Sequence, residues 1–128
     1  MHTDMIRRVS RTNPYRQWLV WQKAKALADE IDKVTNRFPD AERFGLITQM
    51  RRASFSIPTN IVSGSLQSVK REKRRCYRRA QTSLAELDSY INVSHSQFRY
   101  IGRGHMRRLA VLQRDVDRLL KALVHFVP

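Results

Sequence analysis

Apolar residues recur along this chain at alternating intervals of three and four, which is the spacing of one face of an α-helix. Four such stripes follow one another, so the sequence predicts four amphipathic helices. The first is expected at about residues 15–37 and the second at about 41–62, while the third follows Ser68 and the fourth follows a turn at 102–104. The predicted inner stripes are, in chain order, Val20, Ala24, Leu27, Ile31, Val34 and Phe38; Leu46, Met50, Ala53, Ile57 and Ile61; Tyr77, Ala80, Leu84, Leu87, Ile91, Ser94, Phe98 and Ile101; and Leu109, Leu112, Val116, Leu119, Leu123 and Phe126.

Two prolines modify this pattern. The residue before a proline is pushed out of the α region, so the segment 38–40 ends the first helix, and Asp40 can cap the second. Pro58 falls inside the second helix and removes the hydrogen bond to the carbonyl of Ser54. We therefore expect a kink or short break near residues 54–59, with a serine hydroxyl compensating and Asn60 buried and hydrogen-bonded beside it.

The connections between the helices are short, and no stretch alternates apolar and polar residues as a strand would. An all-α, antiparallel up-down-up-down four-helix bundle is the economical arrangement. The chain has 128 residues, 41% of them hydrophobic, which suffices for one core. We expect a single bundle domain over residues 14–128, preceded by a flexible basic arm at 1–13.

Charge narrows the classes of partner. The chain has 25 Lys and Arg residues against 11 Asp and Glu, a formal net charge of +14. Solubility alone needs a net charge of only about 2 to 8 in a small domain. The excess favours a polyanionic partner, and a merely solvated basic surface is the alternative.

The densest basic segment lies at residues 70–79, where seven of ten residues are cationic. On a helix these residues form two adjacent stripes of like charge, which repel one another, and they lie at a helix N-terminus, where the macrodipole disfavours cations. Helix stability does not explain them, so we interpret them as phosphate-binding; a solvated face or an ion-pair surface between subunits is the alternative. The candidate residues are Lys70, Arg71, Lys73, Arg74, Arg75, Arg78 and Arg79.

A second basic group is predicted at the junction of the third and fourth helices, at the other end of the third. Phe98 and Tyr100 nearby could stack on exposed bases, although their position on the helical seam favours the core. Because the two groups are far apart along the helix, they are expected to form separate patches. The candidate nucleic-acid-binding residues of this group are Arg103, Arg107 and Arg108, with Arg99 and His105 beside them.

No catalytic or metal-binding pattern stands out. The four histidines are scattered, Glu86 and Asp88 face different directions on a helix, and Cys76 has neither a partner thiol nor an obvious base. We therefore expect a non-enzymatic protein without a cofactor. The lone cysteine fits a reducing compartment, and the chain lacks both an apolar leader and a run of about 18 apolar residues, so we expect a cytoplasmic protein without a membrane span.

The sequence also resembles a known family. The residues that carry the resemblance are Trp21-Gln22-Lys23-Ala24, Phe38-Pro39, Glu42-Arg43-Phe44-Gly45-Leu46, Gln49-Met50-Arg51-Arg52-Ala53, Ser56-Ile57-Pro58, Asn60-Ile61, Gly64, Ala80, Ser83-Leu84 and Glu86-Leu87. They are similar to the four-helix bundle family of 23S ribosomal RNA intervening-sequence proteins. The resemblance implies a bacterial, non-enzymatic homopentamer. A related branch, the accessory variability proteins of diversity-generating retroelements, binds a reverse transcriptase and nucleic acid.

The chain departs from the family pattern after Asn60-Ile61, where Val62-Ser63-Gly64 replaces the usual Ala-Glu-Gly. This departure removes a shared glutamate, while the added positive charge favours a nucleic-acid role.

Three functions remain open. The leading hypothesis is an oligomeric binder of RNA, or less favourably DNA, with little sequence specificity. The alternative is a protein-interaction scaffold, such as an accessory subunit of a reverse transcriptase, that docks an acidic protein or a ribonucleoprotein. Association with anionic membranes is a weaker third possibility.

Overall fold

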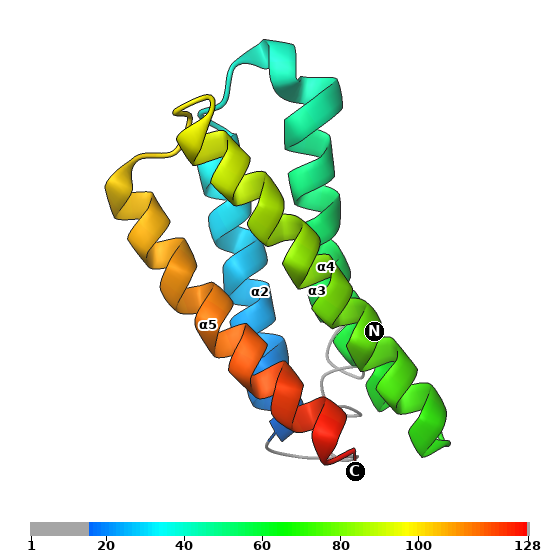
Figure 1. Ribbon diagram of the computed structural model, residues 1–128. Coiled ribbons are helices and arrows are strands. Elements are labelled where there is room, and N and C mark those ends of the chain that lie inside the picture. The colour runs from blue at the N-terminus through cyan, green and yellow to red at the C-terminus, as the bar shows by residue number, and fades with distance from the viewer. Residues whose placement is uncertain (1–15, 128) are drawn as a thin grey trace.

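The computed structural model describes residues 16–127, which form four long helices and contain no strand. They are α2 (Arg16–Thr35), α3 (Thr48–Ser65), α4 (Lys70–Ser96) and α5 (Arg103–His125). Figure 1 shows these helices running alternately up and down, so the predicted all-α antiparallel bundle is confirmed. The basic arm predicted at residues 1–13 lies outside the described part of the chain.

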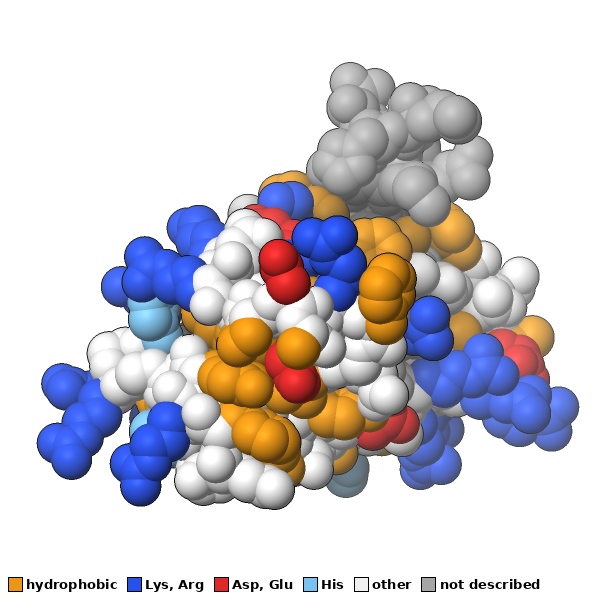
Figure 2. Space-filling model, turned by 90° about the horizontal axis from the view of Figure 1, so that it is seen from above, with side chains coloured by type: hydrophobic (Ala, Val, Ile, Leu, Met, Phe, Trp, Pro, Cys, Tyr) orange, Lys and Arg blue, Asp and Glu red, His pale blue; other side chains and the backbone are white. Residues whose placement is uncertain are grey.

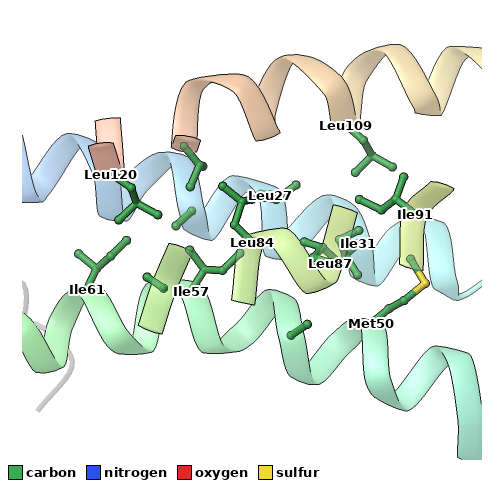
Figure 3. Close-up of a cluster of buried hydrophobic side chains, with 14 of the residues drawn as sticks. Leu27, Ile31, Met50, Ile57, Ile61, Leu84, Leu87, Ile91, Leu109 and Leu120 are labelled. Atoms are coloured by element: carbon green, nitrogen blue, oxygen red, sulfur yellow. The ribbon is translucent and has the colours of Figure 1, made fainter. Parts of the chain in front are cut away.

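Helices that follow one another in the chain pack together, and α2 packs against α5 to close the ring. The core lies inside this ring, where aliphatic side chains from all four helices meet (Figure 3). Every residue of the stripe predicted for the first helix is buried, and so are Met50, Ala53, Ile57 and Ile61 on α3. Within residues 16–127, no helix is long and apolar enough to cross a membrane.

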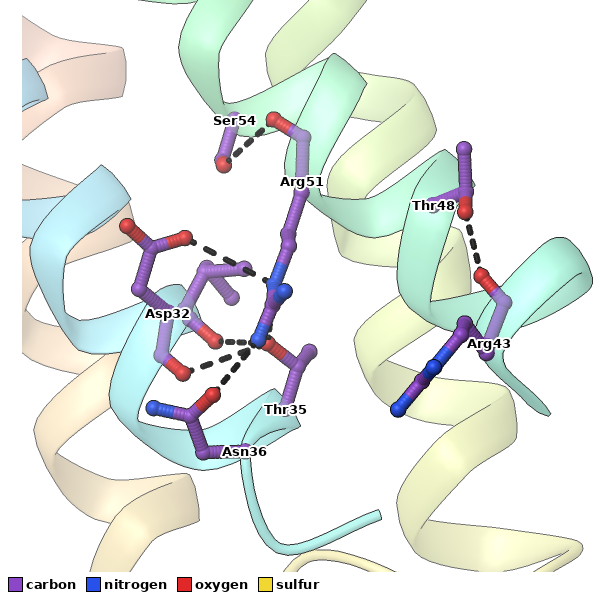
Figure 4. A network of polar contacts seen from close by, with 8 residues as sticks. Asp32, Thr35, Asn36, Arg43, Thr48, Arg51 and Ser54 are labelled. Atoms are coloured by element: carbon purple, nitrogen blue, oxygen red, sulfur yellow. Dashed lines mark hydrogen bonds and ion pairs between the residues drawn. The ribbon is translucent and has the colours of Figure 1, made fainter. Parts of the chain in front are cut away.

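The predicted second helix begins later than its pattern indicates. Residues Asp40–Glu42 form a 3₁₀ turn (η1) and Arg43–Ile47 form a π-helical turn (η2) before α3 begins. Leu46 and Ile47 are only half-buried here, and Phe44 is 94% exposed. Residues 43–47 therefore gain less from burial than α3 does. The hydroxyl of Thr48, the first residue of α3, donates to the carbonyl of Arg43 across the change in helix type (Figure 4).

Arg51, one of the residues that carry the family resemblance, joins α3 to the end of α2. Its Nε donates to Thr35 Oγ1 at 2.9 Å, its Nη2 donates to Asn36 Oδ1 at 2.8 Å, and the carboxylate of Asp32 lies 3.8 Å away (Figure 4). These contacts fix the α2–α3 corner, which gives this part of the motif a structural role.

The expected break at Pro58 is absent, because α3 continues through it to Ser65. Side chains in the next two positions supply hydrogen bonds to carbonyls of the preceding turn. Thr59 Oγ1 donates to the carbonyl of Phe55, and Asn60 Nδ2 donates to the carbonyl of Ser56. Neither bond reaches the carbonyl of Ser54, whose backbone partner Pro58 removes, so they do not replace it as a serine hydroxyl was expected to; Asn60 is half-buried rather than buried.

Two ends of the predicted stripes are wrong. On α5 the buried position is Leu120 rather than Leu119, and Phe126 is 59% exposed. On α4 the buried seam stops at Ser94, because the helix ends at Ser96. Phe98 is 42% exposed, and Ile101, which is buried, lies in the loop that follows α4.

Candidate nucleic-acid interface

The orientation of α4 is set by a close approach to α3. A Cβ atom at Gly64 would lie 2.4 Å from the Cε1 atom of Tyr77, so only glycine fits here. The hydroxyl of Tyr77 accepts a hydrogen bond from Nε2 of Gln17 on α2, and both side chains are fully buried. This burial disfavours the phenolate and raises the pKa of Tyr77 to about 12.

Lys73 belongs to this inner face. Its ammonium group donates to the carbonyl oxygens of Gly64 and Ser65, at 3.3 Å and 3.2 Å, in the last turn of α3. Helix-terminal carbonyls lack intrahelical partners, so this contact caps α3. Burial lowers the pKa of Lys73, and its exposure is 7%. This placement corrects the expectation that Lys73 is part of the exposed basic surface.

Arg74 is half-buried and links two helices. Its Nε donates to the carbonyl of Val124 at 3.1 Å, in the last turn of α5. Arg74 therefore serves the fold while its remaining surface borders the exposed arginines.

Those exposed arginines line a shallow groove of about 660 Å³ on the outside of α4. We call it the α4 groove; its lining residues are Arg71, Glu72, Arg74, Arg75, Arg78, Arg79 and Thr82. Glu72 is its one acidic residue and lies 3.9 Å from Arg71 and 3.6 Å from Arg75. Arg78 and Arg79 form no ion pair with any other residue that the structure describes. Lys70 is exposed at the start of the same helix but does not line the groove.

The basic surface also reaches α5, which the sequence did not predict. Lys121 and His125 of α5 line a second concavity together with Arg74 and Arg78 of α4. Residues on different helices meet only through the packing of α4 on α5, so sequence spacing carries no signal for this contact.

The second basic group lies at the other end of α4, about 30 Å from Arg75 at the usual helical rise. Arg108 is held by the fold: its Nη1 lies 3.1 Å from Oε1 of Glu30, and Nδ1 of His105 lies 3.5 Å from the same oxygen. Glu30 is 5% exposed, so this carboxylate joins α2 to α5 and is compensated by Arg108.

Arg99, Arg103 and Arg107 are exposed in the same region and form no ion pair within residues 16–127. Figure 2, a view onto this end of the bundle, shows Lys and Arg side chains projecting on opposite sides with few acidic ones among them. The two predicted basic groups are therefore separate surfaces. In each group some cations form contacts within the fold, namely Lys73 and Arg74 in the first and Arg108 in the second.

No group of three or more metal-ligating side chains is found among the described residues, and Cys76 is buried. The functional groups exposed on both basic surfaces are mainly arginine guanidinium groups, which can bind phosphates in bidentate geometry.

The fold and this surface define a class, a basic four-helix bundle with exposed arginine patches. The chain belongs to the family of 23S rRNA-intervening sequence proteins, whose family model matches residues 16–123. No curated protein matches the chain.

Proposed function

We propose that this protein is a non-enzymatic, oligomeric nucleic-acid-binding protein that contacts phosphates through the α4 groove, with RNA favoured over DNA. The observation that carries the proposal is the groove itself, in which five arginines surround one glutamate. The family name, which refers to ribosomal RNA, supports RNA as the partner.

The electrostatics of the groove favour a bound anion. Arginines at intervals of three and four along α4 repel one another by a few tenths of a kcal/mol per pair. A phosphate backbone removes this repulsion and releases its own counterions, so binding gains free energy from both sources. Contacts of this kind read charge and shape, and we expect little sequence specificity.

Self-association is the second part of the proposal. Phe55 on α3 is 68% exposed, Phe44 of η2 is 94% exposed, and Leu66, just beyond α3, is 42% exposed. Large apolar side chains that the fold leaves uncovered are ones that a second copy could cover. The family resemblance leads us to expect a homopentamer.

The test is binding to duplex RNA across a salt series. We compare the parent with an Arg71, Arg75, Arg78 and Arg79 to Gln variant, which spares Lys73 and Arg74 because they serve the fold. The matched control changes the same number of exposed arginines elsewhere, Arg37, Arg52, Arg114 and Arg118, to Gln. Both variants lose the same charge, so a difference between them locates the binding surface.

We expect the groove variant to bind about 100-fold more weakly at about 50 mM salt, with a shallower dependence of log affinity on log salt. The control should lose much less affinity. Equal losses in the two variants would show that net charge, not the groove, carries binding, and undetectable parent binding at about 50 mM salt would overturn the nucleic-acid proposal.

In that last case the scaffold hypothesis replaces it, in which the basic face docks an acidic protein such as a reverse transcriptase. Native mass spectrometry of the parent tests the assembly: a pentamer is expected, and a monomer at micromolar concentration would overturn this part of the proposal.

A further inference from the structure

An aromatic ring is displayed at the second basic surface. Phe98 is 42% exposed and stacks on Tyr100, with ring centroids 5.3 Å apart and planes 12° apart. Tyr100 in turn packs on Phe38, which is buried in the core, at a centroid distance of 5.1 Å. A continuous column of rings therefore leads from the core to the surface.

The loop that carries Phe98 is held in place by hydrogen bonds. The backbone N–H groups of Phe98 and Tyr100 donate to the carbonyls of Val93 and Ser94, at 3.3 Å and 2.8 Å. Nδ1 of His95 lies 2.8 Å from the carbonyl of Ile101. Arg99, which lies between Phe98 and Tyr100 in the sequence, adopts a left-handed conformation with φ 58°, which is uncommon for a residue other than glycine. The ring is presented by a defined turn, so little ordering entropy is lost when a ligand stacks on it.

Exposed arginines lie in the same loop and in the first turns of α5. Arg99 follows Phe98 directly, while Arg103 and Arg107 lie one turn apart at the start of α5 and so share a face. All three are exposed and form no ion pair with the described residues, whereas the neighbouring Arg108 is held by Glu30. An exposed aromatic ring beside unpaired guanidinium groups is the combination that binds unpaired nucleotides, because bases stack on the ring while phosphates contact the cations.

We propose that Phe98, Arg99, Arg103 and Arg107 form a binding site for single-stranded RNA, with Phe98 stacking on an unpaired base. The site deepens the proposed function, on which it rests, and differs from the α4 groove in ligand: the groove binds phosphates of paired or unpaired strands, and this site requires an exposed base.

The test uses two fluorescein-labelled probes at one salt concentration, an oligouridylate of about 12 nucleotides and an RNA duplex of equal length. The variants are Phe98→Ala and Phe98→Tyr. The control is Phe126→Ala, which removes an exposed phenylalanine at the opposite end of the bundle. Thermal unfolding and oligomeric mass are recorded for each protein.

We expect Phe98→Ala to weaken oligouridylate binding about tenfold and duplex binding less than about twofold. Phe98→Tyr keeps a stacking ring and should bind as the parent does, as should Phe126→Ala. Unchanged oligouridylate affinity in Phe98→Ala would overturn the site.

Equal weakening toward both probes, or an altered oligomeric mass, would also overturn it, because Phe98 would then act through folding or assembly. If the parent binds the duplex and ignores oligouridylate, this inference fails while the proposed function stands; if it binds neither probe, both fail.

Discussion

The two ends of α4 carry basic surfaces of different construction. At the N-terminal end, arginines stand in rows along a regular helix whose inner side is closely packed against α3 through Gly64 and Tyr77. At the C-terminal end, arginines and Phe98 stand on a loop and on the first turns of α5, supported by an aromatic column. The first end offers charge at helical intervals, and the second offers charge beside an exposed ring.

The difference shows that a count of cations does not define a binding surface. Each end uses part of its charge internally, through Lys73 and Arg74 at one end and Arg108 at the other. The remaining exposed arginines can be assigned to ligand binding only after these have been removed from the set. The predictions below test how far the two ends differ, beginning with the packing that fixes α4.

The largest effect is expected for Gly64→Ala, with Gly104→Ala as its counterpart at the other end. A Cβ at Gly64 would overlap the buried ring of Tyr77, whereas a Cβ at Gly104 would meet nothing within 4 Å. Overpacking of this kind costs about 3 kcal/mol, while Gly104→Ala should be neutral or stabilise by up to about 1 kcal/mol. Chemical denaturation of both variants measures the difference.

Similar unfolding free energies for the two glycine variants would contradict this result. They would show that α3 and α4 can separate without penalty and that the groove is not held by a rigid contact. A destabilised Gly104→Ala alone would instead place the close packing at the other end of the bundle.

Gly64 also shows what the sequence could predict. Glycine is the residue type that a close helix approach requires, and the predicted stripes of the first two helices are buried throughout except at Leu46, which is half-buried. Lys73 carried a signal as well, because it precedes Tyr77 by four residues and so continues the inner seam of α4. The many cationic residues around Lys73 obscured its place on the inner seam.

Other features had no usable signal. Leu119 and Leu120 both fit the spacing after Val116, and only the packing of α5 on its neighbours selects Leu120. Phe98 continued the seam in sequence, but α4 ends two residues earlier and Arg99 turns the chain without a glycine. The exposed ring, on which the single-strand site depends, therefore became visible only in the fold.

The next effect concerns pH and the ring of Tyr77. Its pKa is raised to about 12 in the folded protein because burial disfavours the phenolate, against about 10 in the unfolded chain. The folded state therefore keeps a proton that the unfolded state loses between these values. The resulting stability is complete below about pH 10 and is lost as pH rises through about 12, a change on the order of 2 kcal/mol.

Tyr77→Phe provides the control for this titration. Removal of the hydroxyl that Gln17 donates to should cost about 1 kcal/mol at neutral pH. The variant cannot form a phenolate, while all other groups titrate as in the parent, so the parent's advantage of about 1 kcal/mol should close and then reverse in favour of the variant as pH rises from about 10 to 12. Parallel unfolding curves over this range would show that Tyr77 ionises without cost in the folded state.

The smallest effect separates two cations of the same segment, Lys73 and Arg75. Lys73→Met fills a similar volume but removes two hydrogen bonds to the end of α3, and should destabilise by about 1 kcal/mol. Arg75→Met changes an exposed residue and should alter stability by less than about 0.5 kcal/mol.

The effects of the two substitutions on RNA binding should be reversed, because Arg75 lines the α4 groove and Lys73 does not. The salt dependence of duplex RNA binding should become shallower in Arg75→Met and stay unchanged in Lys73→Met. A shallower salt dependence in Lys73→Met, at unchanged stability, would mean that its ammonium leaves the carbonyls of α3 to contact phosphate, and the division between structural and binding cations would then fail at this end.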